Sequence, residues 1–230
     1  MDAHRMDAHR IHPHRISLSL LLACCLAAPA LGQDVRKPDL QALATDAGAP
    51  VRNRNAEPLD DGARRGLHLD ARPGDGVLWL PGVELADGTI EVDVRGRNAP
   101  GRSFVGVVFH GADDETYEGV YLRPFNFRAE DPQRRAHSVQ YIFSPAYPWN
   151  VLREAHPGKY EAALDPAPDP EGWVRLRVVL AGPEARVYVD GAERPALVVT
   201  RLSEATRGRV GLWVGNDSEG DFADVRITSP

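Results

Sequence analysis

A stretch near the middle of the chain, YEGVYLRPFNF at residues 117–127, combines side chains that suit sugar binding. Successive side chains of a strand alternate between faces, so with Val120 and Leu122 facing the core, the tyrosines and the arginine share the opposite face. Aromatic rings pack against the C–H faces of sugars, while a planar guanidinium donates paired hydrogen bonds. The pattern predicts either a ligand-binding stripe or an ordinary solvated strand face, formed by Tyr117, Tyr121 and Arg123.

Residues elsewhere in the chain extend this stripe. Asn126 lies in the turn after Pro124, from which its side chain can reach back to the strand. In HSVQYIF and GLWVG, Gln140 and Trp213 alternate with apolar residues, so we expect both on the ligand face. For Trp213, a single exposed aromatic residue without a ligand is the alternative. The candidate ligand-binding residues are Tyr117, Tyr121, Arg123, Asn126, Gln140 and Trp213.

Candidate catalytic groups are fewer. A glycosidase normally has two carboxyl groups about 5–10 Å apart across the scissile bond, and the predicted ligand face carries no such pair. Glu118 shares its strand face with core residues, and the chain has no nucleophile-elbow sequence for Ser-His-Asp catalysis. Glu118, His110 and His137 are the candidates for acid–base chemistry, so a hydrolase or a lyase stays open beside a binding protein.

Two acidic loops, GADDET and NDSEGD, offer carboxylates that suit calcium, which prefers oxygen ligands. A zinc site is not expected, because His110 has no second histidine at ligand spacing. We expect the two loops to be solvated acidic turns and expect no cofactor, and a structural calcium ion is the alternative. The candidate calcium ligands are Asp113, Asp114, Asp217 and Asp221.

Strands must position these residues, because short β-type runs broken by Gly, Pro, Asn and Asp follow one another from Val51 onward. PG at 81, DG at 87, DG at 190 and GND at 215 predict turns. So many antiparallel strands need two packed sheets, and we predict an all-β jelly-roll sandwich. The predicted strands span 64–71, 76–80, 88–95, 103–110, 117–124, 136–143, 173–180, 185–189, 196–200, 209–214 and 221–228.

Residues 144–172 form a long, proline-rich excursion between two predicted strands. One or two helical turns are predicted around 150–155, with Gly158 as the stop. Loops of this length are often functional, and this one carries Tyr147, Trp149 and Tyr160. The alternative to a functional loop is a decorated hairpin between the two strands.

Five segments, in their order, resemble the concanavalin A-like lectin/glucanase superfamily: GTIEVDVRG, FVGVVFHGADDETYEGVYLRPFNF, HSVQYIF, WVRLRVVLAGPEARVYVDG and GRVGLWVGNDSEGDFADVRI. More narrowly, they resemble the laminin-G-like and 3-keto-disaccharide hydrolase-like domains of secreted bacterial proteins. The resemblance covers residues 51–228 and implies a two-sheet jelly roll whose concave face often receives a sugar chain. It selects no activity, because the fold hosts lectins, hydrolases, lyases and spacer domains. Where glucanases carry E-x-D-x-x-E, this chain has EVDVRG.

The first 32 residues are predicted to be a secretory signal peptide. MDAHR occurs twice, so translation starts at Met1 or Met6. A basic segment precedes an apolar run that is shorter than the ~20 residues of a transmembrane helix. Cleavage after Gly32 removes both cysteines of the chain. In the alternative, LLAC is a lipoprotein cleavage box, which leaves a lipid anchor on Cys24.

Removal of residues 1–32 takes away three arginines and two aspartates, which leaves 24 basic and 31 acidic residues and a net charge of −7. An acidic surface argues against nucleic acids and anionic membranes as partners. Residues 33–50 are predicted to be a polar lead-in, and residues 51–230 one domain. We predict an exported, periplasmic or secreted glycan-binding sandwich. The alternatives are a carbohydrate-active enzyme, and a structural domain whose ligand face the 144–172 loop blocks.

Overall fold

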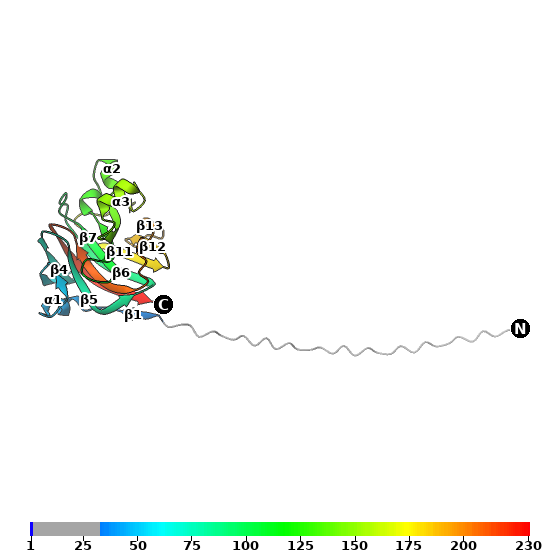
Figure 1. Cartoon of the computed structure of the whole chain (residues 1–230), viewed down its shortest axis with the longest axis horizontal. Coiled ribbons are helices and arrows are strands. Elements are labelled where there is room, and N and C mark those ends of the chain that lie inside the picture. The colour runs from blue at the N-terminus through cyan, green and yellow to red at the C-terminus, as the bar shows by residue number, and fades with distance from the viewer. Residues whose placement is uncertain (2–32) are drawn as a thin grey trace. The chain divides into compact units, whose positions relative to one another are not determined.

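The computed structural model describes Met1 and residues 33–230, and the latter form a sandwich of two antiparallel β-sheets (Figure 1). The predicted signal peptide, including Cys24, lies outside the described residues apart from Met1. No helix within the described part of the chain has the length and apolar character needed to cross a membrane.

One sheet has eight strands. Its order is β13-β12-β11-β6-β15-β4-β3, and β1 also pairs with β15. The strands are β1 (Asp34–Arg36), β3 (Ala56–Asp60), β4 (Arg65–Arg72), β6 (Gly88–Arg95), β11 (Val174–Ala181), β12 (Glu184–Val189), β13 (Leu197–Thr200) and β15 (Ser218–Ser229).

The other sheet has seven strands in the order β10-β9-β8-β7-β14-β5-β2. The strands are β2 (Val51–Arg52), β5 (Gly76–Leu85), β7 (Val105–Gly111), β8 (Tyr117–Leu122), β9 (Val139–Ser144), β10 (Glu161–Ala162) and β14 (Gly208–Val214). Neighbours far apart in sequence, such as β7 and β14, therefore lie side by side in the middle of this sheet.

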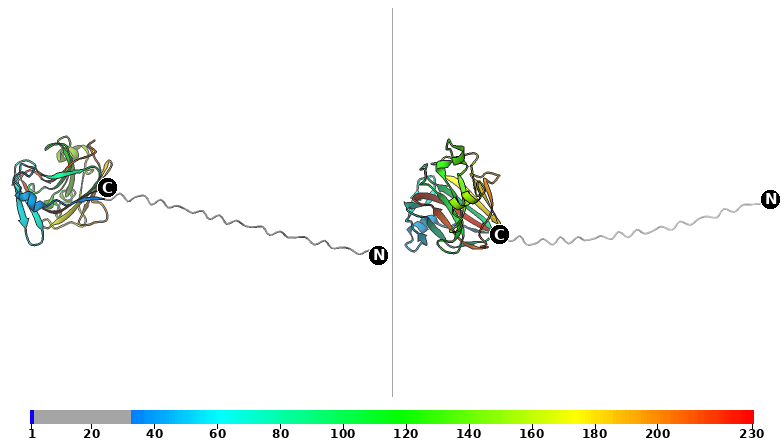
Figure 2. Two further views of the ribbon diagram at one scale, coloured as in Figure 1. Left: turned by 90° about the horizontal axis from the view of Figure 1, so that it is seen from below. Right: turned by 45° about the horizontal axis from the view of Figure 1, so that its top comes forward.

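Short helical segments accompany the sheets: α1 (Leu40–Thr45), the 3-10 turn η1 (Pro124–Asn126), α2 (Pro132–Arg135) and α3 (Trp149–Ala155). α2 and α3 lie together at one end of the sandwich, as Figure 1 and the right view of Figure 2 show. α3 packs next to β9, so this end covers part of the seven-stranded sheet.

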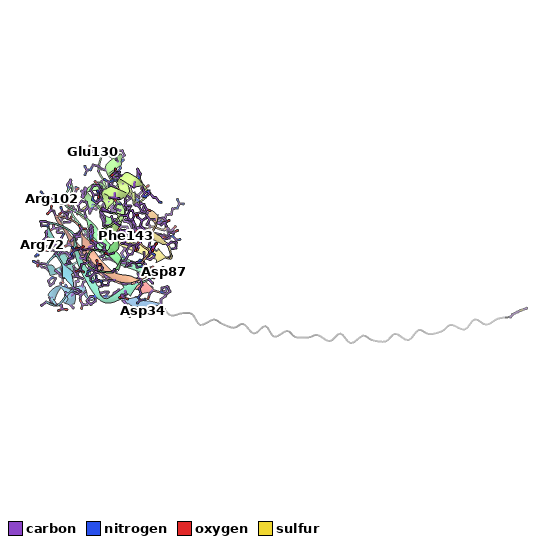
Figure 3. All side chains as sticks on the ribbon, viewed as in Figure 1. Asp34, Arg72, Asp87, Arg102, Glu130 and Phe143 are labelled. Carbon is purple, nitrogen blue, oxygen red and sulfur yellow. The ribbon has the colours of Figure 1, made fainter. Side chains whose placement is uncertain are left out.

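Alternating side chains build the core between the sheets. In β6, Ile90, Val92 and Val94 are at most 1% exposed. Val120 and Leu122 of β8 are fully buried and face them from the other sheet, as the alternation predicted. Figure 3 draws the side chains of the described residues on the ribbon. The two-sheet prediction is confirmed, and with it the face assignment of Tyr121.

All eleven predicted strands are present, and the helical turn predicted at 150–155 is α3. The four strands that the sequence missed are β1, β2, β3 and β10, all at or near sheet edges. The predicted turn at Pro81 is wrong. β5 continues through it to Leu85, and a bulge opposite Arg209 and Gly211 absorbs the irregularity.

Residues 33–50 fold onto the domain, which differs from the expected lead-in. β1 pairs with β15, and α1 contacts β3 and β4. Leu40 is 5% exposed and belongs to the core, while Asp39 caps α1 by accepting a hydrogen bond from the backbone N–H of Ala42. Leu43 and Ala44 also pack against the core, and the side chain of Gln41 donates to the carbonyl of Leu59, so the segment belongs to the folded domain.

Candidate functional site

The outer face of the seven-stranded sheet carries the aromatic residues of the predicted stripe. Trp213 and Tyr121 both pair in register with Gly106, so the three residues share one row across β14, β7 and β8. Because Gly106 has no side chain, the two rings meet above it, with centroids 4.9 Å apart. A Cβ atom at Gly106 would lie 2.1 Å from the carbonyl oxygen of Val120. Glycine is therefore required beneath this ring pair.

A pocket of about 210 Å³ opens beside the ring pair. Tyr121, Trp213, Phe104 and Trp149 supply its aromatic walls. Phe104 packs edge-on against Tyr121, with centroids 5.9 Å apart. Trp149 comes from α3 and is 45% exposed, whereas Trp213 is only 4% exposed. The expected outward Trp213 is thus on the predicted face, but other side chains cover most of it.

Asp75 supplies the charge of the pocket. Its carboxylate accepts a long hydrogen bond of 3.4 Å from the hydroxyl of Tyr117, which in turn accepts one of 3.2 Å from Nε1 of Trp213. Burial raises the pKa of Asp75, although Tyr117 and Arg54 act in the opposite direction. Burial also raises the pKa of Tyr117 to about 12, so its hydroxyl stays protonated and donates.

Arg54 holds the loops that carry the polar rim. It is 5% exposed, and its guanidinium donates to the backbone oxygens of Asn53, Gly74 and Gly215 at 2.6, 2.7 and 2.8 Å. The side chain of Asn216 adds a further link by accepting a 2.7 Å hydrogen bond from the N–H of Gly74. The turns on either side of the pocket are therefore tied to one buried cation.

Arg123 lies on the predicted face but does not line the pocket. It is 4% exposed, and it donates to the hydroxyl of Tyr121 at 2.8 Å, to the carbonyl of His137 at 3.0 Å and to Oε1 of Gln140 at 3.2 Å. Burial lowers its pKa. The prediction of Arg123 as an accessible donor is wrong, because these groups of the protein already occupy its N–H groups.

The 144–172 excursion covers this part of the face. Its strand β10 extends the sheet beyond β9, and Arg153 of α3 pairs with Glu161 at 2.7 Å. Gln140 donates to the carbonyls of Tyr141 and Tyr160, so it too is occupied and is 1% exposed.

Asn126 lies nearby, as predicted for the turn after Pro124. Its side chain donates to the carbonyl of His137 at 3.3 Å, and it is 5% exposed. The blocked face of the structural alternative is therefore present only in part. The excursion covers Arg123 and Gln140, and Arg134 of α2 donates to Asn126, while Tyr121 and Trp213 still line an open pocket.

Solved structures with the same arrangement of sheets include three that superpose with TM-scores above 0.5. The carbohydrate-binding module CBM66 from Bacillus subtilis gives a TM-score of 0.54 at 16% identity, over 77% of this chain and 95% of the module. A Bacillus subtilis protein of unknown function with a galectin-like fold gives 0.55 at 14% identity, over 84% and 94%. The exoplasmic/lumenal domain of VIP36, bound to calcium and mannose, gives 0.54 at 11% identity, over 85% and 88%.

The chain has a concanavalin A-like jelly-roll fold. No protein-family model and no curated protein sequence matches it.

The three catalytic candidates lie at two separate places in this concanavalin A-like fold. Glu118 is fully buried between the sheets, where it accepts a 2.5 Å hydrogen bond from the hydroxyl of Tyr141 and lies 3.0 Å from Nδ1 of His110. Arg201 completes this cluster at 3.4 Å from Glu118. Burial, together with the charge of Glu118, raises the pKa of Tyr141. The carboxylate serves the interior and does not reach the pocket.

His137 lies beside Glu161, at 2.8 Å from its carboxylate. Burial lowers the pKa of His137, although the charge of Glu161 favours the protonated form. This pair belongs to the part of the face that the excursion covers. His137, His110 and Glu118 therefore do not form one acid–base site.

The calcium candidates are dispersed as well. Asp113 accepts hydrogen bonds from the backbone of its own turn, and Asp114 accepts one of 2.8 Å from Nε1 of Trp79. Asp217 accepts a bond from its neighbour Asn216, while Asp221 lies on the other sheet. Residues 33–230 contain no group of three acidic, histidine or cysteine side chains placed to hold a metal. The four calcium candidates are therefore not brought together at one site.

The pocket residues that were absent from the sequence-based candidates include its charged residue, Asp75, and two of its aromatic residues, Phe104 and Trp149. All three lie outside the regular strands: Asp75 in a turn, Phe104 before β7 and Trp149 in α3. Strand alternation therefore does not predict where their side chains point. The signal that did exist was the cluster of aromatic residues in the 144–172 excursion, which includes Trp149.

Proposed function

We propose that this protein binds carbohydrate and that one sugar ring enters the pocket on the outer face of the seven-stranded sheet. The pocket itself is the observation that carries the proposal. It combines the aromatic walls of Tyr121, Trp149 and Trp213 with the polar side chains of Asp75, Ser144 and Asn216. Aromatic faces for the C–H groups and polar atoms for the hydroxyls are the two contacts that a sugar ring needs.

The size of the pocket indicates how much of a glycan it takes. Its 210 Å³ is smaller than the ~300–1,000 Å³ typical of sites for drug-sized ligands. This volume suits a single ring with the rest of the glycan outside. Trp149, which is 45% exposed at the edge of the pocket, and Tyr147, which is 38% exposed nearby in sequence, offer aromatic surface for the next unit.

The named functions of similar structures support the same class of ligand. CBM66 is a carbohydrate-binding module, and the VIP36 domain was captured with mannose. The VIP36 structure also contains calcium, whereas our proposal uses only the side chains of the pocket.

Two tryptophans allow a matched test of the proposal. Trp149 stands at the pocket, whereas Trp173 lies by the other sheet, where it bonds to Asp61 and packs under Arg95. We expect Trp149→Ala to weaken retention on a panel of polysaccharides by about tenfold or more, through lost stacking and burial. Trp173→Ala should retain full binding. Equal retention of the wild type and Trp149→Ala would reject the pocket as the binding site.

We also propose that the protein is exported, with residues 1–32 as its signal peptide. The mass of the mature N-terminus distinguishes cleavage before Gln33 from a lipid-modified Cys24.

A further inference from the structure

We infer that the pocket selects a neutral sugar ring and that Asp75 recognises an adjacent pair of its hydroxyl groups. This inference rests on the proposed function, because it concerns the same pocket.

The charge of the lining favours a neutral ligand. Among the described residues that line the pocket, Asp75 is the one with a charged side chain, while Ser144 and Asn216 are neutral. A uronic acid or a sulfated sugar would bring a second negative charge next to Asp75 in a partly desolvated site. Like charges at such short range repel strongly where water is excluded.

The nearest cations are not free to neutralise an acidic ligand. Arg123 is bonded to Tyr121, Gln140 and His137, as described above. Arg153 pairs with Glu161 at 2.7 Å, behind the ring of Trp149.

On the side of Asp75, the two neighbouring arginines are also engaged. Arg54 donates to three backbone oxygens, and Arg52 pairs with Glu115 and with the carbonyl of Asp114. The charges of both arginines act to lower the pKa of Asp75, although neither arginine lines the pocket. None of the four arginines lines the pocket.

Asp75 has unused capacity to accept hydrogen bonds. A carboxylate offers about four acceptor positions. Asp75 receives a long side-chain bond of 3.4 Å from Tyr117 and a backbone bond from Asn216, which leaves acceptor positions for a ligand. A half-buried carboxylate with unused acceptor positions is costly to keep. Its two oxygens match two hydroxyls on neighbouring ring carbons, which donate in parallel as a guanidinium does.

The backbone around Asp75 is held in place, which suits recognition of fixed hydroxyl positions. The side chain of Asn53 donates to the carbonyls of Pro73 and Asp75 at 2.8 and 3.1 Å. Arg54 fixes the adjacent Gly74. A carboxylate on such a braced turn loses little freedom when a ligand binds, so its hydrogen bonds contribute fully to affinity.

The test is a titration of the full chain, followed by tryptophan fluorescence, with methyl glycosides of glucose, galactose, mannose and fructose and with the uronic acids of the three aldohexoses. We expect at least one neutral glycoside to bind at least about tenfold more tightly than its uronic acid. Asp75→Asn should weaken the binding of the neutral glycoside by about tenfold or more, because charge-assisted hydrogen bonds are lost. It should also reduce the difference in affinity between the neutral glycoside and the uronic acid. Glu115→Gln, which removes the same charge from a 75% exposed side chain, should change neither affinity.

The outcomes separate the two proposals. If no glycoside binds, or if Trp149→Ala leaves binding unchanged, the proposed function fails and the inference fails with it. If binding depends on Trp149 but the uronic acid binds as tightly as the neutral sugar, only the inference is overturned. The same holds if Asp75→Asn, with a wild-type circular dichroism spectrum, keeps full affinity.

Discussion

The eight-stranded sheet and the pocket on the seven-stranded sheet treat their carboxylates in opposite ways. On the eight-stranded sheet, Asp93 pairs with Arg64 at 2.7 Å and with Arg175 at 3.0 Å. Asp221 likewise meets Arg95 at 2.8 Å and His68 at 2.7 Å. On the seven-stranded sheet, Asp75 has no basic side chain within ion-pair distance among the described residues.

The difference shows in the pKa values. Burial alone would raise the pKa of Asp221, but the hydrogen bonds from His68 and Arg95 outweigh it, and the pKa is lowered. For Asp75, burial prevails and the pKa is raised. A carboxylate surrounded by cations has little acceptor capacity left for a ligand, whereas Asp75 keeps free acceptor positions. Binding capacity therefore lies where the protein leaves polar atoms without partners.

The largest predicted effect is on the eight-stranded sheet. Asp93→Ala leaves Arg64 and Arg175 without their shared carboxylate and should lower the free energy of unfolding by about 1–3 kcal/mol. This is less than the ~3–5 kcal/mol for a fully buried pair, because both arginines are about one-third exposed. Urea denaturation measures the loss.

Asp60→Ala is the matched control on the same sheet. Asp60 and Arg65 form a largely exposed pair, so this variant should lower the free energy of unfolding by no more than ~1 kcal/mol. Neither variant should change glycan affinity in the folded protein. A folded Asp93→Ala protein that no longer binds would contradict the division of roles between the two faces.

Substitution of Asp75, on the seven-stranded sheet, is predicted to have a smaller effect and to raise stability. The native pKa of Asp75 lies above its unfolded value of 3.8, so the ionised form is disfavoured by folding. The stability that the protonated form contributes is present at low pH and is lost as the pH rises through the native pKa. Because asparagine resembles the protonated form, Asp75→Asn should raise the melting temperature at pH 7.

This gain should shrink as the pH falls towards the unfolded pKa of Asp75, which melting curves between pH 7 and pH 4 would show. Asp93→Asn should instead lower the melting temperature at pH 7. A variant Asp75→Asn that is less stable than the wild type at pH 7 would show instead that the ionised carboxylate stabilises the folded protein.

Much of the fold follows from alternation. Ile90, Val92 and Val94 on one side of β6, and Val120 and Leu122 on one side of β8, identify the two inner faces, because a sandwich core demands period two. The same alternation correctly puts Tyr121 and Trp213 on one outer face.

The missed strands lack this signal. β2 and β10 have two residues each, and β3 contains Pro58, which an edge strand tolerates. Their pairing depends on the rest of the sheet, so local sequence does not reveal them.

The candidate site was predictable only in part, because alternation assigns a face and not its exposure. It could not show that the 144–172 excursion would cover Arg123 while leaving Tyr121 at a pocket. Asp75, Phe104 and Trp149 meet only through tertiary packing of three separate segments. Their proximity is a property of the folded chain, and their local sequences do not predict it.

A crystal structure of the protein with the tightest-binding methyl glycoside would show directly where the sugar binds. We predict one sugar ring against Trp149 and Trp213 on the seven-stranded sheet, with two adjacent hydroxyls within hydrogen-bond distance of Asp75. A sugar bound on the eight-stranded sheet, or one in the pocket with Asp75 left unbonded, would contradict it.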